Sequence, residues 1–168
     1  DAGAPADIRL RSTSGTTFGG TLFVNGTFAS SRKIIMATNG GTGSANAVLA
    51  GIEVSAGNTF TLNTSPVLQS GSVNNATLVK SGTGTLVLNG TTASALTGLT
   101  IGSINGGGGV VRTTVLSGTP LVDAATGRVT IGGGTLHLDN SAGGSAQNIV
   151  IPRFAYSAGS SVQLTGGS

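Results

Sequence analysis

Apolar residues recur at every second position in short segments that are separated by glycine and small polar residues. The clearest case is a pattern of eleven residues that occurs at 52–62 (I-E-V-S-A-G-N-T-F-T-L) and again at 154–164 (F-A-Y-S-A-G-S-S-V-Q-L). In both copies the first, third, ninth and eleventh residues are apolar, and a Ser-Ala-Gly corner separates the two pairs. A two-residue period is typical of strands. Each copy therefore predicts two short strands joined by a corner.

The same pattern starts three more times between these copies. It begins at Leu78, at Leu99 with an enlarged turn at 106–109, and at Val129 in a form one residue shorter. The starts lie on average about 25 residues apart, which suits one supersecondary unit that must stack on its neighbours to bury its apolar side. We expect a single all-β domain over residues 1–168, a parallel β-helix (β-solenoid) with about 25 residues per coil. A sandwich of glycine-rich hairpins is the alternative.

Parallel stacking of the coils predicts columns of equivalent residues. Two inward apolar columns and one polar column are expected: Ile52, Leu78, Val129 and Phe154; Phe60, Leu86, Leu136 and Val162; and Thr59, Thr85, Thr135 and Ser161. Lys80 stands where the pattern has an inward apolar residue. Because a buried ammonium without a partner is costly, we expect the strand to end at Val79 with the lysine reaching solvent at the corner, or the lysine to be paired.

Residues 76–90 (A-T-L-V-K-S-G-T-G-T-L-V-L-N-G), preceded by 51–62, resemble the autotransporter-associated β-strand repeat, the passenger-associated transport repeat of bacterial surface proteins. The clear match covers 51–90, with looser echoes at 97–114, 127–140 and 152–166 and a departure from the pattern at 91–97. The resemblance implies a right-handed parallel β-helix at the cell surface or secreted, used as a stalk or passenger segment and without catalytic residues. It also implies a corner role for Lys80.

Charge and cysteine content favour an extracellular setting. The 168 residues include eight basic and five acidic residues and no cysteine, so disulfides and thiolate metal sites are excluded. No apolar stretch is long enough for a membrane-spanning helix, and we expect no membrane insertion of this segment. Asp1 in place of an initiator methionine predicts a processed chain or a piece of a longer one.

The formal net charge of +3 does not by itself indicate nucleic-acid binding. The close basic pairs are Arg9 with Arg11 and Arg32 with Lys33, and no aromatic stacking platform lies between them. We therefore expect no nucleic-acid partner. Residues 1–19 are expected to form an N-terminal arm or strand, with an alternating segment at 7–13 that pairs with a neighbouring copy.

Candidate chemistry is sparse. Asp123, Arg128, His137 and Asp139 are close in sequence, but His137 and Asp139 alternate with inward leucines and are expected on the surface. We therefore predict no enzyme activity, no catalytic residue, no cofactor and no metal. Glu53 is expected at an exposed strand position. Four Asn-x-Ser/Thr sequences are interpreted as corners, with glycosylation left open: Asn25, Asn63, Asn75 and Asn89.

These features favour a structural, non-enzymatic β-solenoid that is secreted or displayed on a bacterial surface and self-assembles head-to-tail into a fibre. Its partners would be further copies, or the adjoining coils of a longer chain. A passenger stalk or adhesin segment is the first alternative. A glycan-binding or polysaccharide-cleaving β-helix is the second, although one Tyr, five Phe and no Trp offer few rings for sugar stacking.

Overall fold

The computed structural model describes residues 7–12, 18–38, 47–63, 68–70, 75–90, 96–102, 107–114, 121–123, 125–141 and 148–166. In these residues all regular structure is strand, and no helix has the length and apolar character needed to cross a membrane. The strands are β1 (Ile8–Ser12), β2 (Phe18–Val24), β3 (Phe28–Ser30), β4 (Ile34–Thr38), β5 (Ala47–Val54), β6 (Thr59–Leu62), β7 (Leu68–Ser70), β8 (Asn75–Ser81), β9 (Thr85–Leu88), β10 (Gly98–Ile101), β11 (Val110–Thr113), β12 (Arg128–Ile131), β13 (Thr135–Asp139), β14 (Arg153–Tyr156) and β15 (Ser161–Thr165).

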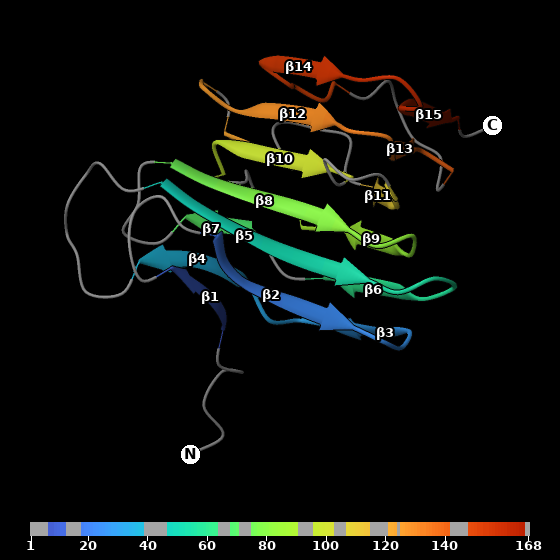
Figure 1. Cartoon of the computed structure of the whole chain (residues 1–168). Coiled ribbons are helices and arrows are strands. Elements are labelled where there is room, and N and C mark those ends of the chain that lie inside the picture. The colour runs from blue at the N-terminus through green and yellow to red at the C-terminus, as the bar shows by residue number, and fades with distance from the viewer. Residues whose placement is uncertain are drawn as a thin grey trace.

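The strands form three parallel sheets that the chain visits in turn. A short sheet has the order β1-β4-β7, a front sheet β14-β12-β10-β8-β5-β2, and a rear sheet β15-β13-β11-β9-β6-β3. Each described pairing is parallel, and each joins strands from successive coils. The strands rise as rungs from β2 and β3 to β14 and β15 (Figure 1). This arrangement is a parallel β-solenoid and confirms the predicted fold class.

The rear sheet has the predicted period. Phe60, Leu86, Val111, Leu136 and Val162 are register partners in turn, so successive coils are 25 or 26 residues apart. The expected inward column of Phe60, Leu86, Leu136 and Val162 is confirmed, with Val111 as an additional member. The polar column is confirmed for the pairs Thr59–Thr85 and Thr135–Ser161, and Val110 lies between them.

One predicted column of the front sheet is partly wrong. Leu78, Val129 and Phe154 do share a column, with Leu99 as an additional member between the first two, but the partner of Leu78 on β5 is Ala50. Ile52 instead pairs with Lys80. A shift of two residues keeps every side chain on its own face of the sheet, so the alternating pattern alone does not reveal it.

The corner after β8 accounts for this shift. Gly84 N–H donates to the Val54 carbonyl at 3.0 Å, and a Cβ at Gly84 would lie 2.3 Å from the Ser55 carbonyl oxygen. Only glycine can approach the preceding coil this closely. The corner that follows β8 is therefore tighter than the one that follows β5, which places β8 two residues further along.

Lys80 is in the core, and β8 continues past Val79 to Ser81. Its side chain is fully buried between the register partners Ile52 and Ile101, and its Nζ donates to the carbonyls of Ser81 at 2.7 Å and Gly82 at 3.0 Å. The alternative in which this lysine reaches solvent is wrong, because the corner folds its own carbonyls over the ammonium. The alternative in which the lysine is paired is confirmed, with these two carbonyls as its partners. Burial lowers the Lys80 pKa to about 8, partly offset by the negative charge of Glu53.

Candidate functional site

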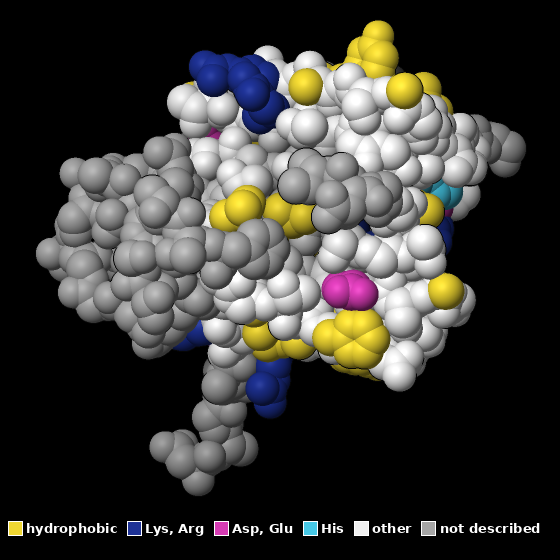
Figure 2. Space-filling view, viewed as in Figure 1, with side chains coloured by type: hydrophobic (Ala, Val, Ile, Leu, Met, Phe, Trp, Pro, Cys, Tyr) yellow, Lys and Arg dark blue, Asp and Glu magenta, His cyan; other side chains and the backbone are white. Residues whose placement is uncertain are grey.

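The last coil leaves its apolar inner face open. Phe154 and Tyr156 on β14 pair with Val129 and Ile131, which are fully buried, yet their own exposed fractions are 44% and 77%. On β15, Val162 and Leu164 are also exposed. A hollow of about 230 Å³ opens between the two strands, lined by Ile131, Phe154, Tyr156, Ser160, Ser161 and Val162. Figure 2 shows hydrophobic side chains gathered at the top of the molecule, above β14.

The same coil has two free strand edges. β14 is the last strand of the front sheet and β15 the last strand of the rear sheet. Within the described part of the chain, neither strand pairs on its outer side, so alternate backbone N–H and C=O groups face outward. An apolar face next to unpaired edges is a surface that can take up another coil.

The opposite end has a matching pair of edges. β2 begins the front sheet and β3 begins the rear sheet. Phe28 on β3 has its ring centroid 4.9 Å from that of Phe60 and is half exposed, because no described coil covers its other side. β1 lies within the predicted strand at 7–13 and pairs with β4 of the same chain. Its other edge has no partner among the described residues, and residues 1–6 and 13–17 lie outside them.

The four residues considered for acid–base chemistry are not brought together. Arg128 begins β12 in the front sheet, whereas His137 and Asp139 are on β13 in the rear sheet. Asp123 accepts hydrogen bonds from the backbone N–H groups of Ala125 and Thr126, both at 3.0 Å, and so stabilises the turn before β12. In the described residues no group of three or more His, Asp or Glu side chains could hold a metal ion.

Asp139 is buried, which corrects its predicted surface position. It forms an ion pair with Arg112 of the preceding coil and accepts the backbone N–H of Ser141 at 2.9 Å. Hydrogen bonds from Ser141, and then the Arg112 guanidinium, lower the pKa of Asp139 to about 2. His137 does lie on the outer side, with its Nε2 2.7 Å from Thr165 Oγ1. Glu53 is partly buried rather than exposed as predicted, and it is the register partner of Phe23.

Asparagines hold the corners of successive coils together. Asn25, Asn63 and Asn89 directly follow β2, β6 and β9, as predicted, whereas Asn75 is the first residue of β8. Asn89 Nδ2 donates to Asn63 Oδ1 at 3.4 Å, and Thr114 Oγ1 donates to Asn89 Oδ1 at 2.9 Å. Asn side chains at these corners therefore join one coil to the next.

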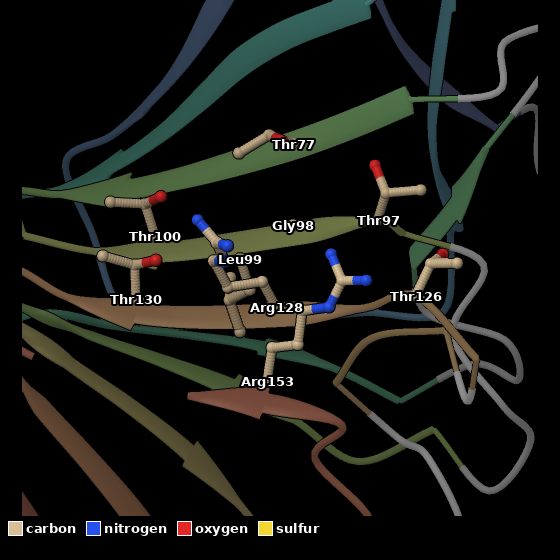
Figure 3. A pocket seen from close by; sticks show the side chains of 9 residues that line it. All are labelled: Thr77, Thr97, Gly98, Leu99, Thr100, Thr126, Arg128, Thr130 and Arg153. Atoms are coloured by element: carbon tan, nitrogen blue, oxygen red, sulfur yellow. The ribbon is translucent and has the colours of Figure 1, made fainter. Parts of the chain in front are cut away.

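A second feature lies on the outer face of the front sheet and was missed by the sequence analysis. Arg128 and Arg153 are register partners on β12 and β14, at the side of an open groove of about 670 Å³. Both side chains are exposed, and Figure 3 shows their guanidinium groups turned away from each other. Their separation of 25 residues, one coil, is the signal in the sequence that predicts this pairing.

Comparisons with protein-family models, with curated proteins and with solved structures give no match to this chain. The resemblance of 51–90 to the autotransporter-associated repeat, and the right-handed coil that it implies, therefore stay predictions.

Proposed function

We propose that this chain is a non-enzymatic structural β-solenoid, secreted or displayed on a bacterial surface, that lengthens by head-to-tail stacking of copies. The observation that carries the proposal is the open last coil, in which residues at core positions of the repeat remain exposed. Burying them against another coil would remove apolar surface from water, and pairing the free edges would satisfy outward backbone groups.

The strands at the two ends run in compatible directions, and both ends expose apolar side chains. β14 and β15 of one copy would pair with β2 and β3 of the next, since the strands within each sheet run parallel. Val162 would then cover Phe28 as Phe60 does on its other side. Such a contact joins two different surfaces and does not close on itself, so repetition produces a filament.

Charge does not oppose this contact. β2, β3 and β15 contain no charged residue, whereas proteins that avoid edge-to-edge association commonly place lysine or other charges on such strands. Arg153 is the one charged residue of β14 and lies on the outer face of the sheet. Among the four strands that would pair, Arg153 is therefore the one charged residue.

The test is negative-stain electron microscopy with analytical ultracentrifugation of the 168-residue chain over a range of concentrations. We expect rods that lengthen with concentration, and discrete monomers for the double variant Val162→Lys with Leu164→Lys. Gln163→Lys is the matched control, because Gln163 is on the same strand and faces outward beside His137. Circular dichroism checks that both variants remain β-folded.

A monodisperse monomer at every concentration would contradict stacking. The open ends would then be explained by the stalk alternative, in which the coils adjoin those of a longer chain. If Gln163→Lys abolished assembly as completely as the double variant does, the proposed contact would also be contradicted. The inner face would then not be what holds copies together.

A further inference from the structure

The outer face of the front sheet carries two arginines directly opposite each other on neighbouring strands. Arg128 and Arg153 are register partners, and the dark blue patch near the starts of β12 and β14 is plain in Figure 2. Like charges at directly opposite positions of a sheet destabilise it. Two of the eight basic residues of this chain therefore lie in an unfavourable arrangement.

Nearby acids do not explain the pair. Among the described residues there is one salt bridge, between Arg112 and Asp139, and it lies in the rear sheet. Asp123, close in sequence to Arg128, directs Oδ1 to the turn at Ala125 and Thr126. The guanidinium groups of Arg128 and Arg153 therefore face solvent without an ion pair among the described side chains.

The groove beside the arginines is kept open by a glycine. Gly98 lies between Thr77 and Arg128 in register, and a Cβ at Gly98 would lie 2.5 Å from Thr77 Oγ1. The lack of a side chain there leaves a hollow over β10. In Figure 3 the Arg153 guanidinium lies on the side of Thr97 and Thr126, and that of Arg128 on the side of Thr100.

The hollow continues along the sheet past the arginines. A second depression of about 390 Å³ shares Thr100 and Thr130 with the first and extends over glycine and alanine to two large residues, Ile131 and Tyr156. Small side chains and hydroxyl groups thus predominate along a shallow track across β10, β12 and β14, which ends beside Tyr156. A linear ligand can lie along such a track, whereas a compact ligand would use only part of it.

We infer that this groove binds an acidic polysaccharide through its carboxylate or sulfate groups. Guanidinium groups bind such planar or tetrahedral oxyanions through paired hydrogen bonds, and their divergence suits two anionic groups on successive sugars. Threonine hydroxyls both donate and accept, as sugar hydroxyls require. Among the described residues that line the groove around the arginines there is no aromatic ring on which a nucleic-acid base could stack, and Tyr156 is the one ring along the second depression.

This inference does not rest on stacking of copies, because the groove around the two arginines faces outward rather than toward the ends. Arg153 and Thr130 would remain accessible in a filament, as they are in a single copy. A filament would add only multivalency, which raises the apparent affinity for a long polysaccharide without any new contact. Binding is therefore measured with the stacking-deficient background Val162→Lys with Leu164→Lys, so that the two proposals succeed or fail separately.

The test is the binding of this protein to polygalacturonate and to dextran sulfate, with neutral dextran and a single-stranded oligonucleotide as comparison ligands. Replacing the pair (Arg128→Gln with Arg153→Gln) should weaken binding of one or both acidic polysaccharides by roughly tenfold or more. The matched control Arg9→Gln with Arg32→Gln removes the same charge from exposed positions elsewhere and should change binding by less than about twofold. The carboxylate and sulfate arms identify which acid is preferred.

A further double variant tests whether the hydroxyl groups of the groove contribute to binding. Thr100→Val with Thr130→Val keeps the shape of both side chains and removes two hydroxyl groups, and should weaken polysaccharide binding by roughly threefold or more. Equal losses in both arginine pairs would overturn the inference in favour of bulk charge. It would also be overturned by binding of neutral dextran as tight as that of the acidic polysaccharides, by tighter binding of the oligonucleotide, or by no binding of either acidic polysaccharide.

Discussion

The coil of β12 and β13 and the final coil of β14 and β15 share one register but differ in burial. Val129 and Ile131 are fully buried, whereas their partners Phe154 and Tyr156 are 44% and 77% exposed. In the rear sheet, buried Leu136 pairs with half-exposed Val162. An apolar inner face is thus a property of each repeat, while its burial requires a coil on both sides.

This difference explains why one sequence pattern can serve two purposes. In a solenoid each repeat contacts only its neighbours, so the stability of a coil is the sum of its own terms and of two interfaces. A middle coil has both interfaces, and the final coil has one among the described residues. The same Phe, Val and Leu positions therefore stabilise the fold in the middle, and at the end they would form the contact surface of the proposed filament.

The largest expected effect comes from truncating register partners in the two coils. Ile131→Ala should lower the free energy of unfolding by about 2–5 kcal/mol, because it leaves a cavity between two coils. Tyr156→Ala, its partner, should lower it by less than about 1 kcal/mol, because the ring is mostly exposed. Urea denaturation in dilute solution, followed by circular dichroism, measures both values.

Equal losses for the two variants would show that the final coil is covered in solution. Repeating the measurement at high protein concentration sharpens the comparison. If copies stack, the loss for Tyr156→Ala should grow with concentration, since mass action links assembly to stability.

A smaller difference is expected between two corner glycines. Gly82 and Gly159 both have positive φ, 71° and 77°, and each lies in the corner between a front and a rear strand. A Cβ at Gly82 would lie 2.3 Å from the Val54 carbonyl oxygen, but a Cβ at Gly159 would meet nothing within 4 Å. Gly159→Ala should cost about 1 kcal/mol for the left-handed backbone, and Gly82→Ala should cost roughly 2–3 kcal/mol because the corner must also move.

Thermal unfolding of the two glycine variants measures this difference. Similar melting temperatures would mean that the corner after β8 is loose enough to accept a methyl group. The tight contact of that corner with Val54, and with it the explanation of the shifted register, would then be wrong.

The fold could be predicted because its signals are local. Alternating apolar residues and glycine corners define strands one by one, and their spacing defines the coil, so the rear-sheet column of Phe60, Leu86, Leu136 and Val162 was correct. The position of Ile52 was wrong because it depends on how closely one corner approaches another. That distance is set by Gly84 packing on the Val54 and Ser55 backbone, not by the length of the repeated phrase.

Pairs of side chains from different coils were harder to predict. The alternation of Asp139 with Leu138 predicts a surface position, yet Arg112, 27 residues earlier, reaches Asp139 from the neighbouring strand. To predict that Arg112 lies beside Asp139, one must know how many residues the enlarged glycine turn before β11 takes up. The sequence pattern does not determine that number. Arg128 and Arg153, in contrast, are one regular coil apart and could have been paired from the period alone.

The smallest expected effect is a dependence of stability on pH that only the middle of the solenoid should show. The Lys80 pKa is about 8 in the folded protein, below its ordinary value of 10.5, because burial disfavours the ammonium. Below about pH 8 the lysine is protonated in both states. Between about pH 8 and 10.5 the unfolded chain binds more protons, so the free energy of unfolding should rise with pH, by an amount on the order of 1 kcal/mol.

Urea midpoints at pH 7.5, 9 and 10.5 measure this rise in the free energy of unfolding. Two variants test whether Lys80, in the middle of the solenoid, causes it. Lys80→Met should abolish the contribution, because no ammonium remains in the core. Tyr156→Lys puts a second lysine on the same inward column, two coils beyond Ile101 through Ile131, but at the open end. Its ammonium can stay in water, so in the Lys80→Met background it should restore no slope. A restored slope would mean that the last coil is buried against a further coil, in which case the distinction between middle and end would not hold in solution.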